Sequence, residues 1–329
     1  MKELLKILPV LKMGCRNAEY PLHAKHIIST GTHVITHNGD TFVMIDYKLP
    51  FTGGVNIYIL NTILKNLSDE YLYDIDDNML RFFDDNYSAK LVIDQFDLSD
   101  FEEFVKKNEE VVSCQLNTIS YDAIKLACNF TGVDDLKFVV LKDNMILSTN
   151  RQKVFFSGVG VGTEDRIAFD PRLINFLSPI HMIGTIDNNT VINFDGGFLV
   201  QSTTSIYDFP VANIISFVER VKDNLIPFME FNKLKEAMDR IFPMSIGEIF
   251  YVSVKTNEDK INVRFESEVN GIAEVQLDRE NDVDVDIILD GAAVRKIEDE
   301  TYYAYLDKKD NNLILKSDKY LISLINVGR

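Results

Sequence analysis

Apolar and polar residues alternate along most of the chain, and a few runs have helical spacing instead. The helical runs lie at residues 2–12, 55–66, 121–130, 170–178, 231–242 and 286–298. Between them, segments with a period of two end at Asp, Asn or Gly, which is typical of strands joined by hairpin turns. The pattern predicts an α+β protein with antiparallel sheets.

Three segments of the chain have the same order of strands and turns. They cover residues 71–93, 181–203 and 302–325, and each contains a strand, a turn with Asp-Asn or Asn-Asn, a second strand, a turn with Asp, and a third strand. Together with the helix spacing, they indicate a repeat of about 110 residues. We therefore predict three domains, at 1–113, 114–226 and 227–329. The alternative is that strands and short helices recur by chance, as they can in any α+β protein.

Four local features carry more specific expectations. Pro9 should kink or end the first helix. The run Asp170–Pro179 predicts a helix, and the alternating Val and Asp at 282–286 predict a strand with one solvent-facing side. The acidic segment 94–110 predicts a connector that follows the first domain.

The charge of the chain bears on possible partners. The formal net charge is −17, which argues against a generic nucleic-acid-binding protein. The six predicted helices nevertheless sum to +3, so the remainder carries −20. If the helices share one surface, that surface could approach DNA phosphates while the rest of the protein repels them. The alternative is that Lys and Arg only solvate exposed helix faces.

The apolar runs and the cysteines bear on localisation. No apolar run approaches the roughly 18–20 residues of a membrane span, and the N-terminal segment is no convincing signal peptide. The three widely spaced cysteines form no disulfide framework and no CxxC pair. We expect a protein of a reducing, cytoplasmic compartment without membrane contact.

Residues that could carry chemistry are few. His23 and His26, like His33 and His37, have ligand-like separations, but no acidic or Cys partner stands at a matching spacing, so no metal site is expected. The glycines of GVGVG at 158–162 precede no helix, which indicates a hairpin or strand junction rather than a phosphate loop. No paired acid and base and no activated nucleophile is present, so we predict no catalytic residue and no cofactor.

Three longer motifs have a family resemblance. They are NMILSTNRQKVFF at 144–156, DPRLINFLSP followed by FDGGFLVQSTTSIYDFP, and FNKLKEAMDRI with INVRFESEVNGIAEVQL. With the repeat order, they resemble the bacterial DNA polymerase III beta sliding clamp, in a divergent form for which phage origin is one alternative. The resemblance covers nearly the whole chain.

The resemblance implies an architecture and a function. Three tandem clamp domains, each with two helices and antiparallel sheets, would form half of a ring, and a head-to-tail homodimer would close it. The ring would encircle double-stranded DNA without reading its sequence, as a processivity factor in the bacterial cytoplasm or nucleoid or in a phage-infected host. It would tether DNA polymerase and clamp loader, without catalysis or cofactor.

Two sets of residues follow from the resemblance and the helix positions. The residues expected to face DNA are Lys12, Arg16, Lys65, Lys125, Lys137, Arg172, Lys233, Lys235, Arg240, Arg295 and Lys296. The residues expected to form a hydrophobic cleft for partner peptides are Thr149, Val154, Pro210, Ile215, Ile322 and Leu324. The turn TNRQKV lacks the Gly and His of the family, so partner peptides are expected to differ from the common motif.

A function of a different class stays open at this point. A viral structural or scaffold protein with repeated β-rich domains accounts equally well for the acidity and the absence of catalytic motifs. Such a protein would form larger or open assemblies and would not depend on DNA. An enzyme is the weakest of the three hypotheses.

Overall fold

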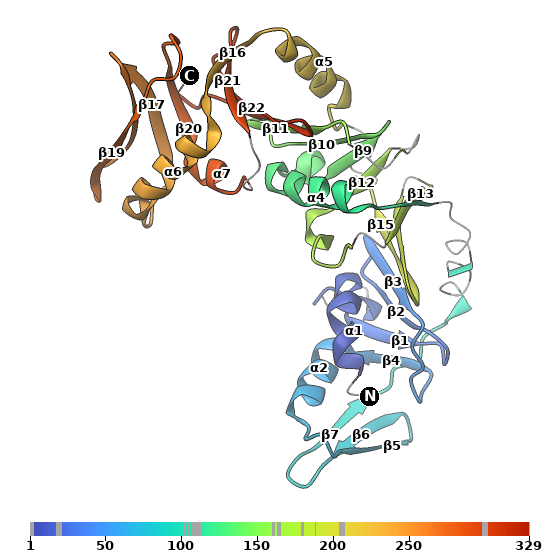
Figure 1. Ribbon diagram of the computed structural model, residues 1–329. Coiled ribbons are helices and arrows are strands. Elements are labelled where there is room, and N and C mark those ends of the chain that lie inside the picture. The colour runs from blue at the N-terminus through green and yellow to red at the C-terminus, as the bar shows by residue number, and fades with distance from the viewer. Residues whose placement is uncertain are drawn as a thin grey trace. The chain divides into compact units, whose positions relative to one another are not determined.

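The computed structural model describes residues 3–17, 22–99, 101, 103, 105–106, 113–159, 162, 166–178, 181–187, 189–203, 208–297 and 302–328 (Figure 1). The chain divides into two compact units. Unit 1 contains residues 1–116 and 175–204, and unit 2 contains residues 117–174 and 205–329. All strand pairs are antiparallel, so the predicted α+β class is confirmed.

Among the described residues, unit 1 contains an eight-stranded sheet, a three-stranded sheet, two helices with fully described bounds, and helical residues at Ser99, Phe101, Glu103, Val105 and Lys106. The eight-stranded sheet has the order β4-β1-β2-β3-β15-β14-β13-β8, and the smaller sheet has the order β5-β6-β7. The strands are β1 (His26–Ser29), β2 (Val34–His37), β3 (Thr41–Ile45), β4 (Gly53–Asn56), β5 (Leu72–Asp76), β6 (Met79–Phe83), β7 (Ser88–Val92), β8 (Ser113–Gln115), β13 (Met182–Ile186), β14 (Asn189–Phe194) and β15 (Gly197–Ser202). The helices are α1 (Leu4–Leu11) and α2 (Ile57–Asn66), which contact each other.

Within the described residues, unit 2 likewise contains two antiparallel sheets and several helices. Its eight-stranded sheet has the order β12-β9-β10-β11-β23-β22-β21-β16, and a four-stranded sheet has the order β19-β18-β17-β20. The strands are β9 (Val139–Lys142), β10 (Met145–Thr149), β11 (Lys153–Ser157), β12 (Ile167–Phe169), β16 (Leu225–Glu230), β17 (Tyr251–Asn257), β18 (Lys260–Ser267), β19 (Gly271–Asp278), β20 (Asp286–Asp290), β21 (Tyr303–Asp307), β22 (Leu313–Lys316) and β23 (Tyr320–Leu324). The helices are α4 (Thr118–Ala127), α5 (Val211–Lys222), α6 (Phe231–Ile241) and α7 (Gly291–Arg295).

Local sequence signals account for most of these elements. In α6, Leu234, Met238 and Ile241 are buried while the polar residues face solvent, as the helical spacing predicts. The side chain of Asn56 accepts hydrogen bonds from two backbone amides at the start of α2, so it caps that helix. Asp77 and Asn78 both have positive φ angles, which is the conformation of the tight turn expected between β5 and β6.

Several sequence-based expectations are wrong. Between Asp170 and Pro179 the described residues contain only the 3-10 turn Pro171–Leu173, because Asp170 caps the turn and little apolar periodicity extends it. The strand expected at 282–286 begins only at Asp286. Pro9 lies inside α1, which continues to Leu11, so of the two expected effects it does not end the helix at its own position.

Two further expectations fall partly outside the described residues. Gly160 of the GVGVG motif lies outside the described residues, and so do residues 100, 102, 104 and 107–110 of the acidic segment 94–110.

Each eight-stranded sheet joins halves of two consecutive repeats. In unit 1, β3 pairs with β15, so the first repeat continues into the closing half of the second. In unit 2, β11 pairs with β23, so the opening half of the second repeat continues into the closing half of the third. We call these two contacts the filled junctions. The two compact units therefore do not coincide with the three predicted domains, whose division stays a prediction.

Candidate functional site

The first helix pair positions three of the cations expected to face DNA. Leu4, Leu8 and Leu11 are buried along α1, which leaves Lys12 half-buried and Arg16 exposed just beyond its end. Lys65 is exposed in the last turn of α2.

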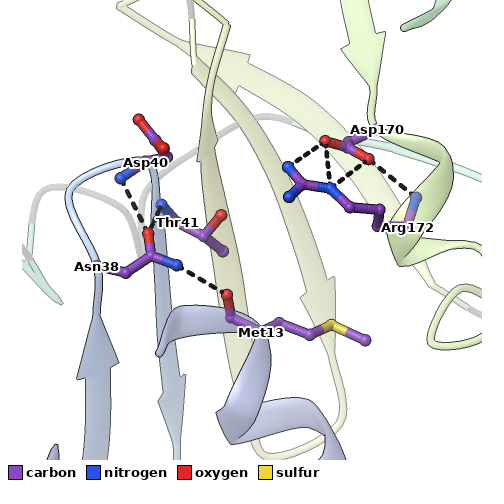
Figure 2. A network of polar contacts seen from close by, with 6 residues as sticks. All are labelled: Met13, Asn38, Asp40, Thr41, Asp170 and Arg172. Carbon is purple, nitrogen blue, oxygen red and sulfur yellow. Dashed lines mark hydrogen bonds and ion pairs between the residues drawn. The ribbon is translucent and has the colours of Figure 1, made fainter. Parts of the chain in front are cut away.

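Asn38 fixes the segment that carries Lys12. Its Nδ2 donates to the carbonyl oxygen of Met13 at 3.1 Å, while its Oδ1 accepts from the amides of Asp40 and Thr41 (Figure 2). The end of α1 is thereby bound to the turn between β2 and β3.

Two of the other predicted cations, Lys233 and Arg295, form ion pairs with residues distant in the sequence. The Nζ of Lys233 lies 2.6 Å from Glu280 Oε1, and the hydrogen bond to Glu280 is the main reason that the pKa of Lys233 is raised. Arg295 donates to Asp239 at 2.5 Å and lies over a nearby aromatic ring. These charges are neutralised within the protein, so they contribute less to an approaching phosphate than their positions suggest.

Arg172 is paired with its own neighbour. Its Nε lies 3.0 Å from both carboxylate oxygens of Asp170, and the two side chains point toward each other (Figure 2). Asp170 is almost completely buried, whereas the Arg172 side chain is largely exposed. The guanidinium therefore balances a buried carboxylate first, and only its outer side is available to a ligand.

The remaining predicted cations differ in their surroundings. Lys235 donates to the carbonyl oxygen of Ile297 at 2.9 Å, and Lys137 lies over the ring of Phe138. Lys125 is exposed on α4. Four of the predicted cations have no side-chain ion pair, hydrogen bond or ring contact within the described residues, and they are Lys12, Lys65, Arg240 and Lys296. The sequence could not separate these four from Lys233 and Arg295, because the partners of those two residues, Glu280 and Asp239, lie far away along the chain.

The predicted peptide site lies within unit 2, where α5 packs on the eight-stranded sheet. Val154 and Phe156 of β11 are half-buried against the core cluster that contains Ile214 and Val218 of α5. We call this side of the sheet the α5 face. Thr149 pairs directly with Val154, so both side chains point to this face.

The other residues predicted for the peptide site divide between two faces of the sheet. Pro210 directly precedes α5 and Ile215 lies in its first turns, and both are half-buried. Ile322 and Leu324 pair with Phe155 and Lys153, which alternate with Val154, so they point away from the α5 face. They are fully buried there, so they do not share the face of Val154 as the expected cleft would require.

Residues that the sequence reasoning missed take their place. Leu321 pairs with Phe156 and Ser323 pairs with Val154, so the α5 face contains this pair instead. Ile325 follows in the same alternation, is half-buried, and donates its amide to the carbonyl oxygen of Gln152 at 2.9 Å. The sequence does not indicate which residues of β23 lie on the α5 face. All five residues of the strand are buried, so no alternation of buried and exposed positions marks its two sides.

Cations border the α5 face. The Nζ of Lys222 lies 5.5 Å from the centre of the Phe156 ring, and Arg220 lies 5.3 Å from that of Phe217. Arg220 also donates to Asp310 at 2.9 Å. Arg220 also lies 3.4 Å from Asp307, so its charge is neutralised within the protein, and Lys222 is the cation that borders this apolar strip.

Comparison with known proteins identifies the fold through solved structures rather than through the sequence. No protein-family model matches the sequence, and no curated protein matches it. A putative DNA polymerase III beta subunit from Eubacterium rectale superposes with a TM-score of 0.78 over 100% of this chain and 98% of that one, at 12% identity. The DNA polymerase sliding clamp of Bacillus subtilis gives 0.78 over 99% and 97%, at 9% identity.

The chain has the sliding-clamp fold.

The Helicobacter pylori beta clamp bound to a DNA ligase peptide is a further match, with a TM-score of 0.76 over 99% of this chain and 98% of that one, at 12% identity. The resemblance predicted from the sequence motifs is confirmed at the level of the fold. At such low identity, the clamp fold leaves DNA contacts, partners and assembly to be argued from this chain's own residues.

Two absences concern only the part of the chain that the structure describes. No helix there is long and apolar enough to cross a membrane. No group of three or more His, Cys, Asp or Glu side chains there could hold a metal ion.

Proposed function

We propose that this protein is a DNA sliding clamp, a ring that encircles duplex DNA and tethers a replicative polymerase. The observation that carries the proposal is the correspondence in fold with solved sliding clamps over 97–98% of their length. The role is mechanical and needs neither catalysis nor a cofactor. It would be performed in a bacterial cytoplasm or nucleoid, or in a phage-infected cell.

The filled junctions indicate how two copies would close the ring. Each of them pairs the third strand of an opening half with the third strand of a closing half, as β3 pairs with β15 and β11 with β23. The halves left over are β20-β17-β18-β19 and β5-β6-β7, whose third strands, β19 and β7, are edge strands of the described sheets. We propose that β19 of one copy pairs with β7 of another, in a head-to-tail homodimer.

The side chains near these two edges are complementary in charge. Beside β7, Lys25 and Lys90 line a pocket of about 580 Å³ with the apolar residues Ile59, Val92 and Phe96. The acidic residue of this lining, Asp94, is paired with His26 at 2.8 Å. Ile59 and Val92 are exposed there.

The surface near β19 carries the opposite charge. The exposed residues Ile246, Val269 and Ile272 lie beside Glu248 and Glu268. Asn270 holds the two loops together, because its Nδ2 donates to the carbonyl oxygen of Ile246 at 3.0 Å. A basic apolar pocket and an acidic apolar surface favour contact between different faces over contact between like faces.

The DNA contact would be weak and independent of sequence. The unpaired Lys12, Lys65, Arg240 and Lys296 supply a few phosphate contacts, while the ion pairs of Lys233 and Arg295 limit the total charge. A sliding ring needs such a lining, because strong phosphate contacts would hold it in place and base contacts would halt it.

The α5 face is the proposed site for peptides of the polymerase and the clamp loader. Its half-buried residues Val154 and Ile325 would contact the peptide, with Pro210 and Ile215 at the border, and the buried Thr149, Leu321 and Ser323 would support them from below. The ligase peptide bound by the Helicobacter pylori clamp supports a peptide-binding role for this fold. Lys222 favours partner peptides with a carboxylate beside their apolar residues, whereas Arg220 is already paired with Asp307 and Asp310.

Native mass spectrometry with electron microscopy tests the assembly. The proposal expects two chains per particle and a central hole of duplex width. Lys25→Glu/Lys90→Glu should yield monomers, and adding Glu248→Lys/Glu268→Lys in the same chain should restore dimers. Open or larger assemblies of the unmodified chain would favour the scaffold-protein alternative and count against the ring.

A further inference from the structure

The outer edge of β5 differs from the equivalent edges of the other two repeats. In the central repeat, β13 pairs with β14 on one side and with β8 on the other. In the third repeat, β21 pairs with β22 on one side and with β16 on the other. In the first repeat, β5 pairs with β6 and is the outermost described strand of its sheet.

The side chains of β5 have the exposure expected of an uncovered edge. Tyr73 pairs with Phe82 as Ala304 pairs with Leu315, so Tyr73 and Ala304 are equivalent positions. Tyr73 is 42% exposed, whereas Ala304 is 0% exposed.

Two residues further along the strand, on the same face, the exposure differs in the same way. Ile75 pairs with Leu80 as Leu306 pairs with Leu313. Ile75 is 41% exposed, whereas Leu306 is 2% exposed.

The third repeat shows what covers such an edge. Met229 of β16 lies opposite Ala304, and Ile226 lies opposite Leu306, in an antiparallel ladder. Phe228 and Met229 are both fully buried, so β16 adds apolar side chains to the core as well as backbone hydrogen bonds. On β5, the equivalent apolar row of Tyr73 and Ile75 has no such cover within the described residues.

The charge around β5 restricts which strand could take this place. Glu70, Asp74, Asp76 and Asp77 are all exposed, and Asp76 pairs with Arg81. Pairing β5 with β5 of a second copy would place carboxylates opposite carboxylates, which is destabilising. A strand with Lys or Arg on its outer side would place opposite charges across the ladder instead.

We propose that the β5 edge binds an extended segment of another protein, in which apolar residues alternate with Lys or Arg. The segment adds an antiparallel strand to the sheet, as β16 does in the third repeat. Its apolar residues cover Tyr73 and Ile75, and its cations face Asp74 and Glu70. This mode of recognition combines backbone hydrogen bonds with alternating side-chain contacts. The site is separate from the α5 face and does not depend on DNA encirclement.

Fluorescence anisotropy on the full 329-residue chain tests the proposal. The probe is a fluorescein-labelled peptide of eight residues in which Lys alternates with Ile. Its controls are the same peptide with Glu for Lys, and a peptide of identical composition with the Lys and Ile residues in separate blocks. We expect the alternating Lys peptide to bind at least tenfold more tightly than either control.

Matched variants separate the β5 edge from general attraction to an acidic protein. Glu70→Lys/Asp74→Lys should weaken binding about tenfold, and Glu70→Gln/Asp74→Asn should have an intermediate effect without reversing the charge. Asp223→Lys/Asp259→Lys makes the same change in net charge at exposed positions elsewhere, and it should leave the affinity within twofold.

Hydrogen exchange locates the bound peptide. We expect slower exchange of the amides in residues 72–76 when the peptide is present. No binding, equal weakening by both Lys variants, or protection at β7 or β19 in place of β5 would each overturn the proposal. Loss of ring formation in other experiments would leave it standing, because the β5 edge belongs to a single chain.

Discussion

The filled β11–β23 junction and the open edges β7 and β19 are built from equivalent strands with different surroundings. In the junction, Phe155 pairs with Ile322, and both side chains are completely buried. At the open edges, Val92 and Ile272 are exposed, and charged residues lie nearby. The chain builds this strand contact twice internally, and one further pair of equivalent halves keeps exposed edges, which we propose a second copy covers.

Breaking the open edges should have the largest effect. Val92→Asp/Ile272→Asp places carboxylates at both proposed contacts, and a closed dimer contains two such contacts. We expect the dimer dissociation constant, measured by analytical ultracentrifugation, to rise at least a hundredfold. The urea midpoint of the monomer should stay unchanged, because both side chains are exposed in the single chain. An unchanged dimer would refute the assigned edges.

Breaking the filled junction should affect folding instead. Phe155→Ala removes a completely buried ring from β11, which costs about 3–5 kcal/mol of unfolding free energy. Urea denaturation followed by circular dichroism measures this loss. Phe83→Ala, at a ring exposed on β6, is the matched control and should cost less than about 1 kcal/mol. Equal losses would contradict the contrast between filled and open positions.

The two faces of the junction can be separated by a further pair of variants. Val154→Glu lies on the α5 face and should weaken binding of a polymerase-derived peptide at least tenfold, as measured by isothermal titration calorimetry. Leu324→Ala lies on the opposite face and should cost about 2–4 kcal/mol of stability while leaving the peptide Kd within twofold. The reverse result would restore Leu324 to the cleft.

The unpaired and the paired cations should differ in their effect on DNA. Lys65→Gln removes a charge without an ion pair, so it should shorten residence on circular DNA about two- to threefold and reduce the salt slope by about one. Lys233→Gln removes a charge that Glu280 already neutralises, and it should change residence less. Single-molecule imaging at two salt concentrations measures both quantities.

Lowering the pH should have the smallest effect on stability, and this effect should be confined to unit 1. All five histidines belong to that unit. The rings of His23 and His37 stack at 5.5 Å, with Phe101 at the edge of His23 and Phe42 beside His37.

Burial is the main cause that lowers the pKa of His23, His37 and His181, and Asp40 opposes it only at His37. Because the folded pKa lies below the unfolded value of 6.5, these residues contribute stability that is complete above that pH. The contribution is lost as the pH falls through the folded values.

Hydrogen exchange at pH 7 and pH 5 measures this effect for each unit. We expect unit 1 to open more readily at pH 5, and His23→Gln/His37→Gln should reduce the difference. Equal loosening of unit 2 would show that the histidines are not the cause.

The sequence predicted the features that depend on local signals. The Asp-Asn turn at 77–78, the apolar stripe of α6 and the order of the three closing segments all correspond to observed elements. The predicted helix after Asp170 failed because the run is short and its cap leads only into a 3-10 turn.

Features set by long-range contacts were beyond the sequence. Ile322 and Leu324 were expected in the cleft from their motif position, but their pairing partners place them on the side of β23 opposite to Val154. Local alternation could not indicate this, because every residue of the strand is buried. The neutralisation of Lys233 depends on Glu280, which lies 47 positions away. The pairing of β3 with β15 likewise joins segments that no local pattern connects.

Retention on circular DNA tests whether this protein closes a ring around duplex DNA. The full chain is incubated with nicked circular DNA, the sample is filtered through a large-pore resin at moderate salt, and one half is then linearised by a restriction enzyme. A topologically closed ring should stay with the circle and be released from the linear molecule within minutes. Equal retention on the circular and the linear form would contradict encirclement.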